Sequence, residues 1–344
     1  MSKSGQELHY PFEVKEFEPK ELEEVRKRFT KAPYDDFIRV GPKGYVFYKG
    51  FLKYAPKIYN FALRPDDTFV VSFPKSGTTW VQEMVWMIAN DCDYEGSVNI
   101  PLTHRYQFLE WGMLFNNKHI QEIADEYSKS DDEKKKLLAA KLKSSDVDIC
   151  ANKPSPRFIK SHLPLSLLPP TLLDTCKVVH VARNPRDVLV SYYYHIKTVA
   201  KLRYDIELKQ LWNLFINDQL EWTPYFENVK ESWTRREHPN MLFLFYEDLL
   251  KDLPSAVKRV AKFLGKTMTE DQVSRLCDHL SFENFKKKNS LVEFSAVSSD
   301  NVLVRKGKSG GWRQYFDEEM KQQATNWMED NLRDSDFKFP FYEN

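Results

Sequence analysis

Three apolar runs in the middle of the chain have the length and the β-branched or aromatic content of buried strands. They are residues 64–73 ("RPDDTFVVSF", where a turn leads into the strand), 176–182 ("CKVVHVA") and 240–250 ("NMLFLFYEDLL", where the strand runs into a helix). Helical spacing of apolar residues follows over residues 76–90, and a further helix is expected from about Pro185 to Val199. Strands that alternate with helices predict an α/β fold with a central parallel sheet flanked by helices.

The remaining segments are more polar. Residues 16–30 are expected to form a short charged helix, and residues 128–146 ("SKSDDEKKKLLAAKLKSSD") a solvated helix or a mobile flap. The chain contains neither an internal repeat nor a low-complexity linker, and this favours a single domain.

Composition and charge argue against several classes of protein. The 344 residues include 51 Lys and Arg against 50 Asp and Glu, whereas a nucleic-acid binder normally has a basic excess. The charged N-terminal segment lacks the apolar core of a signal peptide, and no apolar run approaches the ~18 residues of a membrane span. We therefore expect neither nucleic acid nor membrane as a partner.

The cysteines and histidines indicate no disulfide and no metal. Cys92, Cys150, Cys176 and Cys277 are scattered without CxxC spacing, which is typical of reduced thiols in a cytoplasmic protein. The histidines form no HExxH pair and no cluster with cysteine. A metal site is therefore not expected.

Candidate ligand-binding side chains lie directly after the three predicted strands. Ligands of parallel α/β sheets bind at the carboxyl ends of the strands. In this sequence those ends carry Lys75, Arg183 and Tyr246. Two of these three side chains are cationic, so an anionic ligand is expected.

The turn "PKSGTT" (residues 74–79) joins a predicted strand to a predicted helix, which is a usual geometry for holding a phosphate. Backbone N–H groups would point into this turn, and Gly77 would let the ligand approach the backbone closely. The lysine stands before the glycine, whereas the nucleotide-triphosphatase loop has glycine, then lysine, then Ser or Thr. An ordinary capped turn remains an alternative.

A second anion site is suggested further along the chain. Arg183 ends a strand and Ser191 lies two turns into the next helix, so a guanidinium and a hydroxyl are expected on a common side. The segment "RKGKSGGW" (305–312) offers a flexible cationic clamp. An ordinary ion pair remains the alternative role for Arg183.

Lys160 and His162 stand two residues apart in "RFIKSHLPLSLLPP" (157–170), which reads as an extended segment. Their period of two places both side chains on the same side of that segment. Lone Lys and His residues are usually surface or core residues, but here they add to the two anion-binding elements.

Five motifs together resemble the cytosolic sulfotransferases, in order and with similar spacing from about Tyr34 to Phe337. They are "PKSGTTW" (74–80), "KSHLPL" (160–165), "VARNPRDVLVSYYY" (181–194), "FYEDLLKDLP" (245–254) and "RKGKSGGW" (305–312). Within the family, "PNMLFLFYEDLLKDLP" (239–254) and "YFDEEM" (315–320) resemble insect members, including the moth retinol dehydratase branch. The resemblance implies a P-loop-like sulfotransferase fold.

The resemblance also implies the donor 3′-phosphoadenosine 5′-phosphosulfate, with adenosine 3′,5′-bisphosphate as the product and no metal. The implied donor-binding residues are Lys75, Ser76, Gly77, Thr78, Thr79, Trp80, Arg183, Ser191, Tyr246, Phe282, Arg305, Lys306 and Gly307. The loop of Lys75 would take the 5′-phosphosulfate, and Trp80, Tyr246 and Phe282 would enclose the adenine. The 3′-phosphate would be held by Arg183, Ser191, Arg305, Lys306 and Gly307.

The implied catalytic residues are His162, Lys75, Lys160 and Ser191. By similarity His162 is the general base, and an imidazole titrates near the working pH. Lys75 would neutralise the bridging oxygen as the S–O bond breaks, and Lys160 would lie near the transferring sulfonyl group.

The acceptor site implied by the family comprises Phe51, Phe108, Trp111 and His162. Aromatic walls favour a small hydrophobic alcohol or phenol, of retinoid or steroid size. The domain is expected to span 34–344, after an extension of 1–33. Residues 112–156 are longer than in typical vertebrate members and are expected to form a lid, with a plain surface insertion as the alternative.

Three positions depart from the family pattern. Leu280 stands where threonine is usual near the adenine, and His195 stands where an acceptor-facing aromatic often occurs. The dimerisation motif of vertebrate members should fall at Arg313 to Gln322, but Phe316-Asp317-Glu318 interrupts it. Both a monomer and a homodimer therefore remain open.

Other functions are weighed against simple sulfation. A kinase or nucleotide triphosphatase is disfavoured by the lysine-before-glycine order and by an arginine where a metal-binding aspartate is expected. A non-catalytic carrier of nucleotides or lipids would need neither Lys160 nor His162. A dehydratase, from which sulfate leaves after transfer to give an alkene, is a further alternative because the same donor site serves both reactions.

Overall fold

The structure of the protein is a computed structural model that describes residues 8–28, 37–115, 118–133, 135–136, 139–140, 145–199, 206–287 and 307–340. The strands are β1 (Val14–Glu16), β2 (Phe37–Val40), β3 (Tyr45–Tyr48), β4 (Thr68–Val71), β5 (Tyr106–Phe108), β6 (Phe158–Ser161), β7 (Lys177–Ala182) and β8 (Met241–Phe245). They form a parallel sheet in the order β5-β6-β4-β7-β8 and an antiparallel sheet in the order β1-β2-β3. The predicted α/β fold with a central parallel sheet is confirmed.

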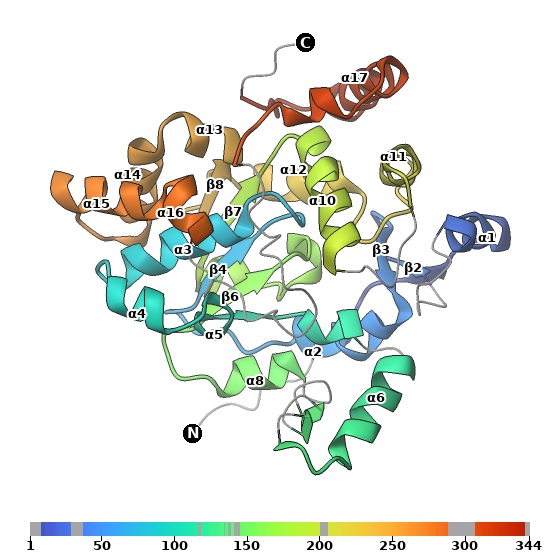
Figure 1. Cartoon of the computed structure of the whole chain (residues 1–344), viewed down its shortest axis with the longest axis horizontal. Helices are drawn as coiled ribbons and strands as arrows, with labels where there is room; N and C mark the ends of the chain where they lie inside the picture. The colour runs from blue at the N-terminus through green and yellow to red at the C-terminus, as the bar shows by residue number, and fades with distance from the viewer. Residues whose placement is uncertain are drawn as a thin grey trace.

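Helices surround the central sheet (Figure 1). From the N-terminus they are α1 (Pro19–Arg28), α2 (Ala55–Tyr59), α3 (Thr78–Ala89), α4 (Tyr94–Asn99), α5 (Leu102–Arg105), α6 (Lys118–Ser128), α8 (Asp146–Asn152), α9 (Leu172–Thr175) and α10 (Pro185–Val199). The second half of the chain adds α11 (Leu208–Ile216), α12 (Tyr225–Trp233), α13 (Tyr246–Lys251), α14 (Leu253–Leu264), α15 (Glu270–Leu280), α16 (Phe282–Lys287) and α17 (Glu318–Leu332). Short 3₁₀ helices are Lys49–Lys53, Trp111–Phe115, Leu165–Leu167 and Gly311–Gln314.

The central strands are buried on both faces, and successive side chains enter two different cores. Phe69 and Val71 of β4 join a core that includes side chains of α10, α11, α12 and α17, whereas Val70 joins a second core with α3, α14 and α15. Figure 1 shows these two groups of helices on opposite sides of the sheet. Burial on both faces explains why the strands read as continuous apolar runs and not as alternating patterns.

The predicted elements agree closely with the structure. The strand within 64–73 is β4, 176–182 contains β7, and 240–250 contains β8 followed by α13. The helix predicted over 76–90 is α3, and the helix from Pro185 to Val199 is α10 with the same bounds. The charged helix expected over 16–30 is the shorter α1. Residues 128–146 are only partly described, so their role as a flap stays a prediction.

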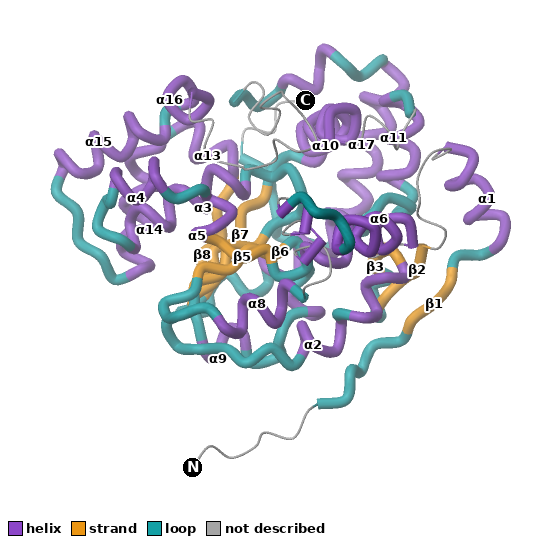
Figure 2. Tube along the Cα trace, turned by 60° about the horizontal axis from the view of Figure 1, so that its bottom comes forward, coloured by secondary structure: helices purple, strands orange, loops and turns teal. Residues whose placement is uncertain are grey.

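The small antiparallel sheet was not predicted. β2 and β3 have only four residues each, and they are joined by a turn in which Gly41 (φ 73°) and Gly44 (φ 68°) have left-handed conformations. On its other edge, β3 bonds to a distant loop, because the N–H of Val46 donates to the carbonyl of Thr223 at 2.8 Å. Figure 2 shows this sheet beside the central one, near α1. Its stability depends on tertiary partners that a local pattern does not reveal.

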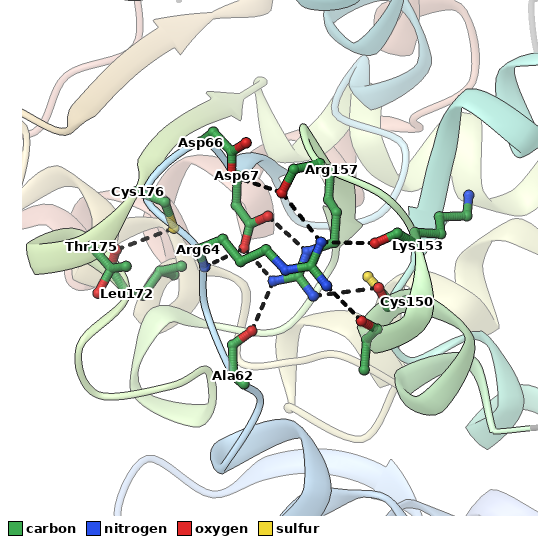
Figure 3. A network of polar contacts seen from close by, with 12 residues as sticks. Ala62, Arg64, Asp66, Asp67, Cys150, Lys153, Arg157, Leu172, Thr175 and Cys176 are labelled. Carbon is green, nitrogen blue, oxygen red and sulfur yellow. Dashed lines mark hydrogen bonds and ion pairs between the residues drawn. The ribbon is translucent and has the colours of Figure 1, made fainter. Parts of the chain in front are cut away.

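A buried ion pair fixes the starting ends of β4 and β6 relative to each other. Nη2 of Arg157 lies 2.6 Å from Oδ2 of Asp67, and its Nε lies 2.7 Å from Oδ1 (Figure 3). Both residues immediately precede their strands, whose register pairs Thr68 with Phe158. Such a two-pronged contact sets geometry as well as energy. The register places the opposite ends of the same strands, which carry Lys75 and His162, at a fixed separation.

Among the described residues, no helix is both long and apolar enough to cross a membrane. The four cysteines are free thiols, and Cys150 and Cys176 are buried. Burial raises the pKa of each of these two thiols to about 12, so both are neutral in the folded chain.

Candidate active site

The strand order brings the separate sequence motifs to one edge of the central sheet. β4 lies between β6 and β7, so the loop after β4 is flanked by the ends of the other two strands. Lys75 follows β4, Lys160 and His162 lie at the end of β6, and Arg183 follows β7. The structure therefore brings the cationic side chains together at the carboxyl ends of the strands, as predicted.

The turn between β4 and α3 has a backbone that requires glycine. Gly77 adopts φ 103°, and a Cβ built on it would lie 2.6 Å from Cδ2 of Tyr246. Lys75 also has a positive φ of 69°. The buried Oγ of Ser76 has no hydrogen-bond partner within the described part of the chain. A strained turn that leaves a buried hydroxyl unpaired is typical of a ligand loop at a helix N-terminus.

Two lysines at the carboxyl ends of β4 and β6 have lowered pKa values. Burial, followed by the charges of Lys160 and Arg183, lowers the pKa of Lys75 to about 7. Burial lowers the pKa of Lys160 to about 8, and Glu110 opposes that shift. Nζ of Lys160 lies 4.1 Å from the centre of the Phe108 ring. Grouped cations that titrate near neutrality favour an anionic ligand, which would restore their charge.

His162 has one ring nitrogen fixed by the backbone. Its Nδ1 lies 2.7 Å from the carbonyl oxygen of Ser72, so Nδ1 carries the proton and donates it, and Nε2 is left as an acceptor. Burial, with Lys160 as the next cause, lowers the pKa of His162 well below its usual value. The imidazole is therefore neutral near pH 7, with Nε2 available to take a proton.

Aromatic rings enclose this imidazole. The ring centre of Phe108 lies 5.2 Å from that of His162, and the ring centre of Trp222 lies 5.6 Å away. Trp111 packs on Phe108 with a ring-centre distance of 5.7 Å. Because Phe108 contacts both His162 and Lys160, the prediction that these two side chains share one side of the segment is confirmed.

Phe51, also expected at the acceptor, is fully buried and stacks on Phe47 at a ring-centre distance of 4.4 Å. Phe47 in turn lies 5.5 Å from Trp222. These contacts connect Phe51 to the aromatic wall through one intervening ring, and its direct contact with an acceptor stays a prediction.

Arg183 bridges the turn and the C-terminal segment. Its Nη1 donates to the carbonyl of Lys75 at 3.2 Å and its Nη2 to the carbonyl of Lys308 at 3.0 Å. The guanidinium carbon lies 4.2 Å from the ring centre of Tyr246. Its buried Nε has no partner among the residues that the structure describes. One donor therefore remains for a ligand.

The segment 307–312 is held against α10 by Asp187. The carboxylate accepts the N–H of Gly310 at 2.7 Å and the N–H of Trp312 at 3.1 Å. Gly307 has φ 58°, and a Cβ there would lie 2.1 Å from Cδ2 of Phe282. Gly307 and Phe282, which belong to different motifs, are thus in close contact.

The structure does not test the expected roles of three other donor residues. Arg305 and Lys306 lie outside the described residues. Ser191 lies on α10, about two turns into the helix, as expected, and is half-buried. The roles of all three stay predictions.

The aromatic residues expected around the adenine form a group beside the turn. Trp80 and Tyr246 have ring centres 5.6 Å apart with their planes at 66°. Nε1 of Trp80 donates to the carbonyl of Leu280 at 2.9 Å, just before Phe282. The bond uses the Leu280 backbone, so the residue type at 280 does not decide it.

Several polar residues of this region were not predicted. Glu110 accepts the backbone N–H of His162, and Glu247 accepts the backbone N–H of Asn184 at 2.9 Å. Asp187 and His195 also went unassigned as site residues. Burial, with the charges of Lys75 and Lys160, lowers the pKa of His195 well below its usual value, which groups it with the two lysines. The local sequence gives little sign of the two glutamates: Glu110 follows an aromatic run in "EW", and Glu247 follows a strand in "YED".

No group of three or more His, Cys, Asp or Glu side chains within the described ranges is arranged to hold a metal ion. The described groups that converge at this site are mainly cations, hydroxyls and backbone donors, together with the imidazoles of His162 and His195.

Comparison with known proteins identifies relatives of this arrangement. Residues 65–336 match the family model of the sulfotransferase domain. Rat sulfotransferase 1C2 is 33% identical over 76% of this chain and 81% of its own. Luciferin sulfotransferase of Photinus pyralis is 28% identical over 92% of this chain and 85% of its own. A crystal structure of retinol dehydratase with retinol and PAP has 41% identity and a TM-score of 0.89, and covers 97% of this chain and 100% of the other.

Proposed function

The chain belongs to the sulfotransferase family and is an enzyme that uses 3′-phosphoadenosine 5′-phosphosulfate, and from this premise we propose that it sulfates the hydroxyl of a small hydrophobic alcohol or phenol. The match covers most of the chain, and the enzyme class transfers a sulfonyl group to hydroxyl acceptors. The single observation that carries the acceptor class is the neutral His162 imidazole, with Nε2 free, inside an aromatic enclosure.

The site fits the donor on three structural grounds. Gly77 and Gly307 keep the backbone against the rings of Tyr246 and Phe282, since a Cβ at these positions would lie 2.6 Å and 2.1 Å from ring atoms. Ser76 Oγ and Arg183 Nε are buried donors without partners within the described ranges. The cations Lys75, Lys160 and Arg183 lie together with lowered lysine pKa values, as expected for a site that an anion completes.

We assign the donor contacts by resemblance to the family, and the three features above support the assignment at the turn and at Arg183. The turn of residues 75–79 would hold the 5′-phosphosulfate, and Arg183 with Ser191 and residues 305–307 would hold the 3′-phosphate. Trp80, Tyr246 and Phe282 would enclose the adenine. When bound, the donor supplies an activated sulfonyl group whose bridging oxygen leaves as an anion. Lys75 and Lys160 place positive charge where negative charge develops, and electrostatic stabilisation of this kind usually contributes most to the rate enhancement of an enzyme.

His162 would take the acceptor proton at Nε2. The same lysine charges that lower its pKa would be offset by an anionic donor, so donor binding would make the imidazole a stronger base. A positioned base contributes about 10²- to 10⁴-fold to a rate. The carbonyl of Ser72 keeps the proton on Nδ1 and stabilises the imidazolium that results.

The acceptor class follows from the walls of the enclosure. Phe108, Trp111 and Trp222 offer apolar surface next to one polar acceptor atom, an arrangement that favours a greasy body with a single hydroxyl. Two structures of the related retinol dehydratase hold retinol and androsterone, and both of these molecules have that form.

A screen of hydroxyl compounds tests the proposal. The protein and the sulfate donor would be incubated with retinol, a hydroxysteroid, 1-naphthol, a sugar and a tyrosine-containing peptide, and the products resolved by mass. We expect sulfate esters of the hydrophobic compounds. Sulfation of the sugar alone, or of the peptide alone, would overturn the proposed acceptor class.

The same screen separates sulfation from elimination. A retinol dehydratase-like reaction would give a dehydrated product and free sulfate in place of the ester, and the 41% identity to retinol dehydratase favours testing for it. The two products differ in mass, so one experiment distinguishes them. A non-catalytic carrier would give neither.

The domain division remains our proposal. We propose an extension of 1–33, a sulfotransferase domain of 34–344 and a lid within 112–156, together with a cytoplasmic location. Phe17 and Val25 of the extension are buried with β2 and β3, so the extension packs on the rest of the chain.

Replacing Gly307 by alanine is expected to weaken donor binding by one to two orders of magnitude. The new Cβ would lie 2.1 Å from Phe282, and φ 58° disfavours a side chain as well, which together cost about 1–3 kcal/mol. Calorimetry with adenosine 3′,5′-bisphosphate measures the effect. Gly265→Ala is the matched control, because Gly265 has φ 73° and no atom within 4 Å of its Cβ position. An equal loss of affinity in Gly265→Ala would indicate a general effect on folding, and would contradict a local effect of the Phe282 contact at the donor site.

A further inference from the structure

Three separate elements hold His162 in place. After β4, the Ser72 carbonyl accepts the Nδ1 proton at 2.7 Å. From α12, Nδ2 of Asn228 donates to the His162 carbonyl at 3.3 Å. After β5, the Glu110 carboxylate accepts the His162 backbone N–H. The first contact sets the ring and the other two set the backbone that carries it.

The Glu110 contact replaces a missing step of the sheet. β5 pairs with β6 so that Phe108 lies opposite Lys160, and the N–H of Leu109 donates to the Lys160 carbonyl at 3.0 Å. Beyond this point the backbone ladder ends, and the side chain of Glu110 takes the next donor of β6. A buried N–H without an acceptor is costly, so this contact determines the backbone at His162.

Glu110 is more than a packing residue. It is 1% exposed, and its Oε2 has no hydrogen-bond partner in the described part of the chain. Burial raises the pKa of Glu110 to about 7, and the hydrogen bonds with the His162 N–H and the Ser161 side chain, followed by the charge of Lys160, oppose this rise. A glutamine would satisfy the same N–H without the cost of burying a carboxyl group. The Glu110 carboxyl group contacts the backbone of His162 and interacts electrostatically with Lys160.

We propose that Glu110 is a positioning residue for sulfonyl transfer, which holds the His162 backbone so that Nδ1 reaches Ser72 and Nε2 stays available for the acceptor proton. Glu110 acts through His162 and does not touch either substrate. This inference rests on the proposed function, since it assigns the acceptor proton to His162.

Enzyme kinetics on four variants test the inference. Glu110→Ala and Glu110→Gln would each be made in the full chain and in the His162→Ala background, with 1-naphthol as the acceptor. Glu110→Ala is expected to lower kcat about 10- to 100-fold, because it leaves the His162 N–H without an acceptor. Glu110→Gln keeps an acceptor oxygen and should restore kcat to within about threefold of the parent. Without the His162 imidazole, Glu110→Ala should cost less than about twofold more, because the ring that the Glu110 contact positions is absent while the backbone N–H remains.

A measurement independent of turnover is the tautomer of His162. ¹⁵N-labelled histidine resonances, assigned with His162→Ala, should show protonated Nδ1 in the parent and in Glu110→Gln. Glu110→Ala should show a mixture of tautomers. An unchanged tautomer in Glu110→Ala would overturn the inference even if no acceptor were found, whereas failure of every hydrophobic acceptor with an intact tautomer effect would count only against the proposed function.

Glu247 provides a matched control. It too accepts a backbone N–H at the end of a strand, and burial raises its pKa to about 7. It lies beside Arg183 and not beside His162, so Glu247→Ala should weaken donor binding and leave the His162 tautomer unchanged. Three outcomes would count against the positioning role: equal losses of kcat in Glu110→Ala and Glu110→Gln, the same cost with and without His162, or a parallel loss of donor affinity.

Discussion

Replacing His162 by alanine is expected to lower turnover by about 10²- to 10⁴-fold, the range that a positioned general base contributes. The affinity for adenosine 3′,5′-bisphosphate should change little, because the contacts of His162 with Asn228 and Glu110 use its backbone and are kept in the alanine variant. Single-turnover kinetics together with calorimetry on the product nucleotide measure the two quantities separately. The loss should fall on kcat for every acceptor, since each must give up its hydroxyl proton.

His180→Ala is the matched control for His162→Ala. His180 lies on β7, is fully buried and stacks on Phe243, and neither of its ring nitrogens has a partner among the described residues. Its loss should lower the melting temperature through a cavity and leave kcat of the folded enzyme nearly intact. If His162→Ala instead lost stability and nucleotide binding together, with kcat preserved in the folded fraction, His162 would be a packing residue and the assignment as base would be wrong.

The sequence predicted the part of the site that depends on consecutive residues. The turn of 74–79 could be recognised because a strand, a glycine and a helix follow one another, and Gly77 has the left-handed conformation that the turn requires. Lys160 and His162 could be placed on one side because a strand has a period of two. α10 was predicted with its observed bounds because its apolar pattern directly follows a buried strand.

The residues that support the site could not be predicted in the same way. Glu110 meets His162 across 52 positions of sequence, and Asp187 meets Gly310 across 123. Nothing near these acidic residues marks them as buried, and an acidic residue is normally exposed. Trp222, which closes the aromatic wall, adopts a positive φ of 77° that no local pattern indicates. These contacts arise from the order of strands in the sheet, which is a tertiary property.

Lys75→Met is expected to reduce kcat/KM by at least about 10²-fold, comparable to removing one preorganised donor from a charge-stabilising site. Lys75 lies in the turn itself, and the charges of Lys160 and Arg183 both lower its pKa. Methionine keeps the length and the apolar stem and removes only the ammonium. A loss confined to KM for the acceptor would contradict the role of Lys75 at the leaving oxygen.

Donor binding should also be accompanied by proton uptake above neutral pH, and Lys75 should be the main group that takes up the protons. Its pKa of about 7 is set by burial and by neighbouring cations, so an anion at the same place raises that pKa. Between the lowered and the raised value the complex holds more protons than the free protein. Affinity for adenosine 3′,5′-bisphosphate is therefore fully present below about pH 7 and falls as the pH rises above it, and Lys160, with a pKa of about 8, extends the fall.

Calorimetry at pH 8 in buffers of different ionisation enthalpy counts those protons. We expect net uptake in the parent and a clearly smaller uptake in Lys75→Met. Lys153→Met serves as the comparison, because burial lowers the pKa of Lys153 as well, but its Nζ donates to the His104 carbonyl at 3.0 Å and the residue lies beside the Asp67–Arg157 pair, at the opposite edge of the sheet (Figure 3). Lys153→Met should leave proton uptake unchanged. If Lys75→Met took up as many protons as the parent, the lowered pKa would not belong to the donor site, and the positive charge that stabilises the leaving oxygen would have to come from Lys160 or Arg183 instead.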